Sequence, residues 1–250
     1  MSEYWPIDEA LGRKIGEFLC WPQYDEETAL QRIQQLKTLG VEAVATGGPH
    51  EILSTPILGK GHAGVVIRAM FEGREVALKA RRTDTSRLGM GREAGFLAHV
   101  NRWGVGPRLF GVSEDFLVME LLVGPYYGEW VEAHLFDRGA VIDSVRAVLD
   151  TAWRLDQSGL DHGELTRIKR HFIVTVDGPR VIDFESASLD RTPSNLTCTV
   201  QSLFMNHRFA EVLRKVYPMP DRGELLVALK RYKRDPVESN YRLVLEACNL

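Results

Sequence analysis

The stretch that most constrains the fold of this chain is "VVIRAMFEGREVALKA", residues 65–80. β-Branched and apolar residues flank the pair Glu72-Gly73 on both sides. This pattern predicts two antiparallel strands joined by a two-residue turn. From about residue 52 onward, strands are therefore expected to dominate.

Three glycines stand directly before this hairpin, in "LGKGHAGVV": Gly59, Gly61 and Gly64 fit the pattern GxGxxG. The pattern alone is weak, because many matches are ordinary turns or the strand-to-helix bend of a dinucleotide-binding fold. Such a fold needs a helix after the glycines, whereas here poor helix formers continue into the hairpin. A strand–glycine loop–strand lid over phosphates fits better, because missing side chains let backbone N–H groups approach anionic oxygens.

Residues 1–50 are predicted to form an amino-terminal helical extension. Asp25 can cap a helix that Gly40 ends, and "VEAVA" predicts a strand after it. Within the helix, apolar residues recur at helical spacing and predict a core-facing stripe, made of Ala29, Leu30, Ile33, Leu36 and Leu39.

The order of the remaining elements indicates the fold class. "EAGFLAHVNRWG" predicts a helix closed by Gly104, and "FLVMELLVG" predicts a buried strand that ends at Gly124. Beyond Gly124 the pattern is helical, except for a second hairpin in "HFIVTVDGPRVIDFE" with its turn at residues 177–179. We therefore expect an α+β fold with two lobes and a hinge near Gly124. Residues 51–123 would form an antiparallel-sheet lobe, and residues 124–250 a mainly helical lobe.

Composition excludes several classes of protein. A formal net charge of −3 at pH 7 argues against a dedicated nucleic-acid binder, which carries a strongly basic face. The longest apolar run is about half the length needed to cross a bilayer, and "MSEYWPIDEALGRK" does not resemble a signal peptide. The three cysteines lack metal-ligand spacing, which predicts reduced thiols. We expect a soluble, cytoplasmic protein without a membrane partner.

A lysine and an acid follow the glycine loop in an order that indicates a nucleotide site. Lys79 ends the second hairpin strand, where it can project under the lid and neutralise phosphates. Taken alone, a surface lysine on an edge strand would be the favoured interpretation. Glu93, on the next predicted helix, can hold the ammonium group, although alone it could be one half of a solvated pair. The three features together favour a nucleotide site.

The segment "VIDFE" offers a metal ligand. Asp183 follows the end of a predicted buried strand, a place where a carboxylate can face a cleft. Mg²⁺ takes oxygen ligands, and its usual protein anchor is a carboxylate that bridges to nucleotide phosphates. The alternative is an aspartate that only starts a turn.

The glycine loop, Lys79, Glu93 and Asp183, in this order, resemble the motifs of the protein-kinase-like superfamily in its atypical, RIO-like branch. More closely, the chain is similar to a family of predicted archaeal serine/threonine protein kinases. The matching segments span roughly residues 15–210 and include "VALKARRTD", "REAGFL", "GVGPRLFGV", "FLVMELLVG", "LDQSGLDHGEL", "VIDFESAS" and "SNLTCTVQSLF". The resemblance implies a bilobal kinase-like fold that binds ATP and Mg²⁺.

The resemblance also implies a role for each matching residue. The lid would consist of the three glycines and Val66, and Lys79 would contact the α- and β-phosphates while it pairs with Glu93. Asp183 would bind Mg²⁺. The backbone of the segment between the lobes would receive adenine, at Met119, Glu120 and Leu121.

The loop "HGELTRIKRHFIV" departs from the family pattern at two positions. Glu164 stands in the place of the aspartate that accepts the proton of the substrate hydroxyl. Glutamate preserves this chemistry, but its extra methylene moves the oxygens by about one C–C bond length; the alternative role is a helix cap. The usual metal-binding asparagine is replaced by Lys169 or His171, depending on how the loop is counted. Lys169 can supply a charge to a phosphate directly, and we interpret His171 as structural.

The segment after Asp183 also departs from the pattern. Glu185 replaces a glycine, which predicts a site without a backbone flip, and its carboxylate can act as a second metal ligand. No "APE" follows, so the peptide-docking shelf of ordinary protein kinases is expected to be missing. Near Lys79, "RRTD" brings together Arg81, Arg82 and Asp84 as a solvated turn or as a contact for substrate or phosphate.

The sequence therefore favours an ATP- and Mg²⁺-dependent kinase that acts on a Ser/Thr hydroxyl of a protein, its own chain included. Two alternatives stay open. One is a RIO-like kinase or ATPase that acts on a small molecule or within a ribonucleoprotein assembly. The other is a nucleotide-binding pseudokinase that serves as a scaffold.

Overall fold

The computed structural model describes residues 4–12 and 15–250 and shows a mixed α+β protein with antiparallel sheets. The chain divides into two compact units. Unit 1 comprises Met1–Ala98 and Pro107–Leu121, and unit 2 comprises His99–Gly106 and Leu122–Leu250. Among the described residues, no helix combines the length and the apolar character that crossing a membrane requires.

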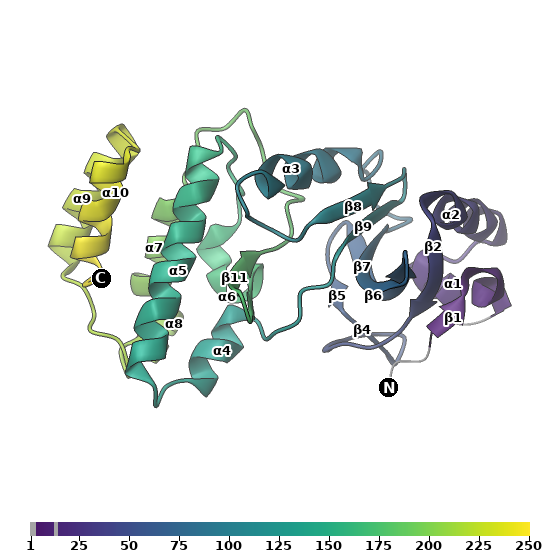
Figure 1. The fold of residues 1–250 in the computed structure, drawn as a ribbon, viewed down its shortest axis with the longest axis horizontal. Coiled ribbons are helices and arrows are strands. Elements are labelled where there is room, and N and C mark those ends of the chain that lie inside the picture. Colours follow the sequence, from purple (N-terminus) through teal and green to yellow (C-terminus); the bar gives the residue numbers. More distant parts are fainter. Residues whose placement is uncertain (1–3, 13–14) are drawn as a thin grey trace. The chain divides into compact units, whose positions relative to one another are not determined.

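Unit 1 contains most of the strands. Its elements, most of them labelled in Figure 1, are β1 (Tyr4–Pro6), η1 (Ile7–Gly12), α1 (Ile15–Leu19), α2 (Glu26–Leu39), β2 (Val41–Ala45), β3 (His50–Ile52), β4 (Thr55–Ile57), β5 (Gly59–Lys60), β6 (Gly64–Phe71), β7 (Arg74–Arg81), α3 (Gly91–Asn101), β8 (Leu109–Val112) and β9 (Phe116–Glu120). The last residues of α3, from His99, belong to unit 2.

The hairpin predicted at residues 65–80 is confirmed as the centre of the main sheet. Phe71 pairs with Arg74, so Glu72 and Gly73 form a two-residue turn, with φ of 49° and 70°. Positive φ at both turn positions is typical of a type I′ turn, whose twist matches that of the strands. The strand order of the sheet is β1-β2-β6-β7-β9-β8, with β5 beside β6. All of these pairs are antiparallel.

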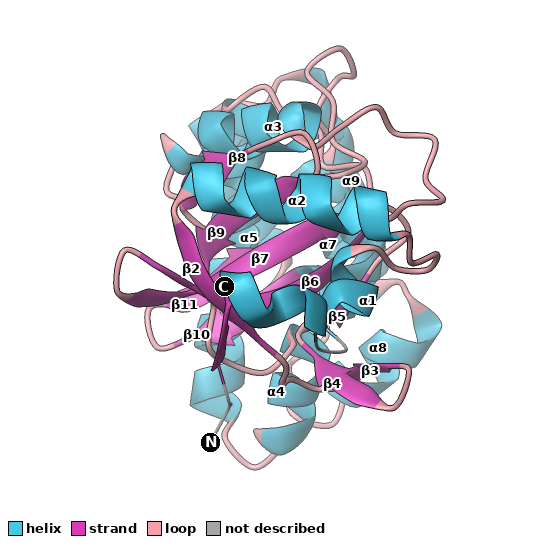
Figure 2. Cartoon of the chain, turned by 90° about the vertical axis from the view of Figure 1, so that its right-hand side faces the viewer, coloured by secondary structure: helices cyan, strands magenta, loops and turns pink. Residues whose placement is uncertain are grey.

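One face of this sheet is covered by the amino-terminal helices, and Figure 2 shows α2 lying across the strands. Along β7, Val76, Leu78 and Ala80 belong to the buried cluster shared with α1 and α2. Alternate residues point to opposite faces of a strand, so Ala77 and Lys79 lie on the other face. This alternation separates the core of unit 1 from the face that carries Lys79.

The predicted helix at the start of unit 1 is confirmed, with its cap. The Asp25 carboxylate accepts a hydrogen bond from Thr28 N at 2.8 Å, and Gly40 ends α2 with φ of 83°. Ala29, Ile33 and Leu36 are buried as expected, but the prediction for Leu30 is wrong, because its side chain is 52 % exposed. Residue 30 lies at the edge of the apolar stripe, where it turns toward solvent. Since α2 and β2 share the buried cluster with β6 and β7, the amino-terminal extension and the strands of the glycine hairpin have one core.

Unit 2 is mainly helical. Its elements are α4 (Tyr127–Ala133), α5 (Arg138–Gln157), η2 (Leu165–Arg167), α6 (Ile168–His171), β10 (Phe172–Thr175), β11 (Gly178–Val181), α7 (Asn195–Phe204), α8 (His207–Leu213), α9 (Arg222–Arg234) and α10 (Glu238–Ala247).

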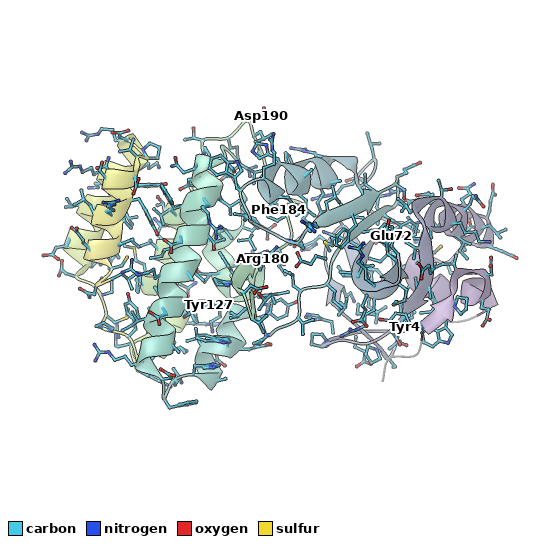
Figure 3. All side chains as sticks on the ribbon, in the orientation of Figure 1. Tyr4, Glu72, Tyr127, Arg180, Phe184 and Asp190 are labelled. Atoms are coloured by element: carbon cyan, nitrogen blue, oxygen red, sulfur yellow. The ribbon has the colours of Figure 1, made fainter. Side chains whose placement is uncertain are left out.

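The long helix α5 organises unit 2. It packs against α7 over a run of buried aliphatic residues, and its Trp153 ring stacks on Tyr241 of α10 with centroids 4.7 Å apart. In Figure 1, α9 and α10 lie side by side at the carboxyl end of the chain. At the opposite end of the unit's sequence, the buried Tyr127 ring, labelled in Figure 3, meets the Phe209 ring edge-on at 5.9 Å.

Two predicted boundaries are wrong. The second hairpin turns at residues 176–177 rather than 177–179, because Thr175 pairs with Gly178. The strand predicted to end at Gly124 ends at Glu120. Gly124 instead has φ of 159°, and a Cβ there would lie 1.9 Å from the carbonyl oxygen of Val174. The glycine thus marks a close approach of two backbone segments in unit 2, and the strand has ended before it.

Candidate functional site

The glycine loop of unit 1 is built as a strand–loop–strand turn, as predicted. Gly59 pairs with Val66, and Gly61 N donates to Gly64 O at 2.8 Å across the loop. A Cβ on Gly64 would lie 2.9 Å from the Ala80 carbonyl oxygen and 3.0 Å from Lys79 Cγ. Gly64 is therefore needed for the packing of the Lys79 side chain. Whether the loop binds phosphate stays a prediction.

Lys79 and Glu93 form a buried ion pair in unit 1. Lys79 Nζ lies 2.7 Å and 3.0 Å from the two Glu93 carboxylate oxygens, so the contact is bidentate. Lys79 is 4 % exposed and Glu93 is 7 % exposed. In the sheet, Val66 and Leu117 are the cross-strand partners of Lys79 and share its face. The ion pair expected from the sequence is present; its use in binding phosphates stays a prediction.

The residues predicted to receive adenine lie at the end of β9. Met119 pairs with Ala77 and Leu109, while the backbone of Glu120 is bonded to Arg108: Glu120 N donates to Arg108 O at 2.8 Å. The Glu120 carboxylate also accepts from Arg108 N at 2.9 Å. Leu121 then ends unit 1. The Glu120 amide is thus occupied by the sheet, so Leu121 is the position of the three that lies beyond the strand pairing.

The nearby cluster in "RRTD" is made of ion pairs. Arg81 Nη2 lies 2.6 Å from Asp115 Oδ1, and Arg82 holds Asp84 at 2.7 Å. The Arg82 guanidinium also lies 4.0 Å from the centroid of the Trp21 ring. These charges therefore have partners within unit 1, as expected for a structural turn.

In unit 2, Glu164 stands where its carboxylate meets two other side chains. Ser186 Oγ donates to Glu164 Oε1 at 2.5 Å, and His171 Nε2 lies 3.3 Å from Oε2. Glu164 occupies the position before η2, but its side chain makes no capping hydrogen bond there among the described residues. The alternative role as a helix cap therefore does not describe this side chain.

A glycine brings the two segments of this cluster together. Gly163 has φ of 85°, and a Cβ there would lie 2.9 Å from the Ser186 carbonyl oxygen and 2.7 Å from Arg191 Nη2. Both the left-handed backbone and the lack of space exclude a side chain. Gly163 therefore lets the segment after β11 lie directly against the backbone that carries Glu164.

The two candidates for the missing asparagine have different surroundings. Lys169 Nζ lies 3.5 Å from Glu132 Oε1 and 4.9 Å from the centroid of the Phe209 ring, with residues of α4 and α8. His171 instead contacts Glu164, and its ring lies 5.4 Å from that of His162. A contact of Lys169 with phosphate would require its ammonium to leave Glu132, and that role stays a prediction.

A buried histidine links this loop to the segment after β11, and the sequence did not mark it as a site residue. His162 is fully buried, its Nε2 lies 3.0 Å from Ile182 O, and its ring meets Phe184 edge-on at 5.2 Å. Burial, followed by the nearby His171, lowers the pKa of His162 to about 4. At neutral pH the imidazole is therefore uncharged.

Asp183 is held in an unusual backbone conformation. It follows β11 with φ of 68°, a left-handed value that few residues other than glycine adopt. Phe184, which comes next and is labelled in Figure 3, is buried against His162. Such strain persists only where the surrounding structure imposes it, and it is concentrated at functional sites. Asp183 and Glu185 are both partly buried.

The segment after Glu185 is short and leads directly into α7, as predicted. Ser188 and Asp161 exchange backbone hydrogen bonds of 2.9 Å, and Arg191 Nε donates to Asp161 Oδ2 at 2.6 Å. Asn195 begins α7, and its Oδ1 accepts from His162 N at 2.8 Å. Asn195 and Ser186 were both missed by the sequence analysis, and no local pattern marks either of them as a neighbour of residues 162–164.

The candidate residues therefore fall into two groups. Unit 1 carries the glycine loop, Val66, the Lys79–Glu93 pair and the end of β9. Unit 2 carries Glu164, His171 and Ser186, with Asp183 and Glu185 on the segment that leads to Ser186. Across the described ranges, no three His, Cys, Asp or Glu side chains gather as a ready-made metal site.

Comparison with known proteins finds a relative of archaeal origin. No family model matches the chain. The uncharacterized protein MJ1211 of Methanocaldococcus jannaschii is 30 % identical over 79 residues, which are 32 % of this chain and 67 % of that protein. The chain belongs to the same family as this archaeal protein.

Proposed function

We propose that this protein is an ATP- and Mg²⁺-dependent phosphotransferase of the atypical, RIO-like protein-kinase type. It would transfer a phosphoryl group to a Ser/Thr hydroxyl of a protein. In this proposal unit 1 is the antiparallel-sheet lobe and unit 2 the mainly helical lobe of a kinase-like fold. The family resemblance of the motifs supports this reading.

The observation that carries the proposal is the buried pair of Lys79 and Glu93. A buried ion pair contributes little net stability, because desolvation of both charges offsets their attraction. A buried lysine next to a glycine loop therefore suggests a function. Glu93 binds the ammonium through both oxygens, which fixes it on the sheet face beside Val66. There it can neutralise phosphate oxygens held by the loop.

The residues of unit 2 supply the other groups that the reaction needs. The Glu164 carboxylate already accepts a hydrogen bond from a hydroxyl, that of Ser186, which is the contact a general base makes. His171 contacts the second oxygen of Glu164 and so helps to orient the carboxylate. Phosphoryl transfer depends mainly on positioning and charge neutralisation, so a glutamate in this place suffices.

The donor groups near Asp183 fit Mg²⁺. Asp183 and Glu185 offer carboxylate oxygens, the ligand type that this hard cation takes. Mg²⁺ is commonly bound by one or two carboxylates together with phosphates and water, so a larger cluster of acids is not required. When bound, the ion would neutralise charge on the phosphate oxygens. In this assignment Asp183 is the primary ligand and Glu185 the second.

The first experiment measures binding of Mg²⁺-ATP to the full chain by titration calorimetry. Lys79→Met should weaken binding at least tenfold. Because this variant leaves Glu93 buried without its partner, the double variant Lys79→Met/Glu93→Leu removes both charges and should fold without binding. Lys37→Met is the matched control: Lys37 is also ion-paired in unit 1, to Asp8, but both side chains are exposed. Its affinity should equal that of the wild type.

The second experiment follows γ-labelled ATP with and without a cell lysate. Label on protein supports the proposed kinase, and Glu164→Gln should bind ATP but lose transfer. Free phosphate or a labelled small molecule would instead support the RIO-like ATPase or small-molecule kinase, which the short segment after Glu185 also fits. Binding without turnover would indicate a scaffold. A wild-type chain that binds no nucleotide would refute all three.

A further inference from the structure

The Ser186 hydroxyl lies against the carboxylate assigned above as the base. Ser186 Oγ is 2.5 Å from Glu164 Oε1 and donates its proton toward that oxygen. A hydroxyl that donates to a carboxylate at this distance is arranged for proton abstraction. We propose that Ser186 is the phosphate acceptor of this chain and is phosphorylated intramolecularly, with Glu164 as the base. This inference rests on the proposed function, because that function supplies the ATP.

Ser186 is held in place through its backbone, which leaves its hydroxyl available. Arg191 Nη2 donates to the Ser186 carbonyl oxygen at 2.7 Å, and Asp161 holds the same guanidinium at 2.6 Å. On the other side, Gly163 lets this carbonyl approach the loop. The serine is half-buried rather than enclosed, so a phosphoryl donor can reach it.

The two oxygens of Glu164 have different partners. His171, itself buried, contacts Oε2, while Oε1 faces the serine. Arg167 Nη1 lies 4.0 Å from Glu164 Oε2, on a side chain that is 75 % exposed. Solvent screens such a contact, so it contributes little to neutralising the carboxylate. The oxygen that accepts from the serine is therefore a different one from the oxygen that contacts His171.

A second serine in the same segment provides a contrast. Ser194 Oγ lies 3.3 Å from Asp161 Oδ1, but Asp161 Oδ2 takes the Arg191 guanidinium at 2.6 Å. The serine contact at Asp161 is longer than that at Glu164, 3.3 Å against 2.5 Å, and the other Asp161 oxygen is already bound by the Arg191 guanidinium. Ser194 should therefore not accept phosphate. It is an internal control for the geometry at Ser186.

The proposed step balances in atoms and charge. Ser186 Oγ forms a bond to the γ-phosphorus of ATP, while the bond from that phosphorus to the β,γ-bridging oxygen breaks. The serine proton passes to the Glu164 carboxylate, and ADP leaves with the bridging oxygen. The phosphoserine carries a charge of about −1.5 to −2, and once Glu164 has released the proton to water the two groups repel each other. Arg191, which already contacts the Ser186 carbonyl, is placed to pair with the phosphate.

The test incubates the full chain with Mg²⁺ and γ-labelled ATP and locates the phosphate by mass spectrometry of peptides. The wild type should carry phosphoserine at 186. Ser186→Ala should carry at least tenfold less protein-bound label than the wild type, and Ser186→Thr should restore the label as phosphothreonine. Ser194→Ala is the matched control and should be labelled as the wild type is. Phosphate at other positions, or unchanged label in Ser186→Ala, would overturn the proposal.

A mixing experiment tests whether the reaction stays within one chain. Wild-type protein is incubated with a longer, tagged Lys79→Met/Glu93→Leu chain, which retains Ser186 and Glu164. Label should appear only on the wild type, and the labelled fraction should not change over a tenfold dilution. Label on the tagged chain would overturn the intramolecular step. Nucleotide binding without any phosphate on Ser186 overturns this inference alone, whereas absence of binding overturns the proposed function as well.

Discussion

The two units hold their buried polar groups by different means. In unit 1 the buried groups are full charges in ion pairs: Lys79 with Glu93, and Asp115 with Arg32, whose Nη2 lies 2.9 Å from Asp115 Oδ1. In unit 2 the buried Asp161 also has an ionic partner, but that partner, Arg191, is 49 % exposed, and two other buried groups have different surroundings. His162 is an uncharged imidazole, and Asp156 accepts hydrogen bonds from Asn195, Leu196 and Tyr232.

This difference has a physical consequence. A buried ion pair destabilises the fold when one partner loses its charge, whereas a buried neutral imidazole destabilises the fold when it gains a charge. Unit 1 should therefore be sensitive to the removal of single charges, and unit 2 to mild acid. Three predictions break or sharpen this comparison.

The largest effect is expected from Asp115→Asn in unit 1. Burial alone raises the pKa of Asp115, but Arg32, with Gln35 and Arg81, outweighs burial and holds this pKa below its ordinary value. Without the carboxylate charge, the buried Arg32 guanidinium is uncompensated, which should cost about 3–5 kcal/mol of unfolding free energy. Hydrogen exchange of peptides from α2, β6 and β7 measures this loss.

The control for this prediction is Glu238→Gln in α10. Its partner Arg242 is 72 % exposed and Glu238 is 60 % exposed, so the change should stay below about 1 kcal/mol. If both variants lost the same unfolding free energy, the buried pair of unit 1 would contribute no more to stability than an exposed pair.

The next effect is a loss of stability of unit 2 in mild acid. The folded pKa of His162 is about 4, below the ordinary value, so protons favour the unfolded chain. The stabilisation is complete above about pH 6.5 and falls as the pH drops through this value toward 4, by up to roughly 3 kcal/mol. Burial raises the pKa of Asp156, despite its hydrogen bonds. Its protonation on acidification has the opposite sign and offsets part of the loss.

Hydrogen exchange at several pH values, corrected for intrinsic rates, checks this prediction unit by unit. Unit 2 should lose protection before unit 1, since Asp115 contributes its stabilisation down to its ordinary range, about pH 4, and loses it only below that. His162→Gln keeps a donor for Ile182 O without a titrating ring and should flatten the profile of unit 2. A profile that does not respond to this replacement would exclude His162 as its cause.

The smallest effect compares one helical glycine in each unit. Gly95 lies inside α3, and a Cβ there meets nothing within 4 Å, so Gly95→Ala should stabilise by about 0.5–1 kcal/mol. Gly223 is the second residue of α9, and a Cβ there would lie 3.1 Å from the capping oxygen of Asp221. Gly223→Ala should therefore gain less or be destabilising. Thermal unfolding distinguishes the two, with a rise of roughly 2 °C for the first.

Local features of the fold could be predicted from the sequence, because the residues that determine them are neighbours. Asp25 and Gly40 mark both ends of α2, and Glu72-Gly73 marks the turn between β6 and β7. The predicted turn of the second hairpin lies too far along the chain, because Gly178, with φ of 108°, is the first residue of β11 rather than the centre of the turn.

The contacts of the candidate site were harder to predict. The Lys79–Glu93 pair could be expected because a strand and the next helix carry the two residues in a known order. The contact of Ser186 with Glu164 joins residues far apart in the chain, and it depends on the backbone approach at Gly163. Asn195 likewise reaches His162 from the start of α7. Periodicity contains no information about such contacts, because tertiary packing decides them.

The pairing of β2 with β6 bears on how this protein can be shortened. β2 supplies hydrogen-bond partners to β6 from Arg68 to Phe71, and α2 covers the apolar face behind them. A fragment that started after residue 45 would have β6 as an exposed edge strand, next to aliphatic side chains that α2 no longer covers. Chains with such an edge tend to aggregate. Recombinant truncations should therefore retain the first 45 residues, even where only the glycine hairpin is of interest.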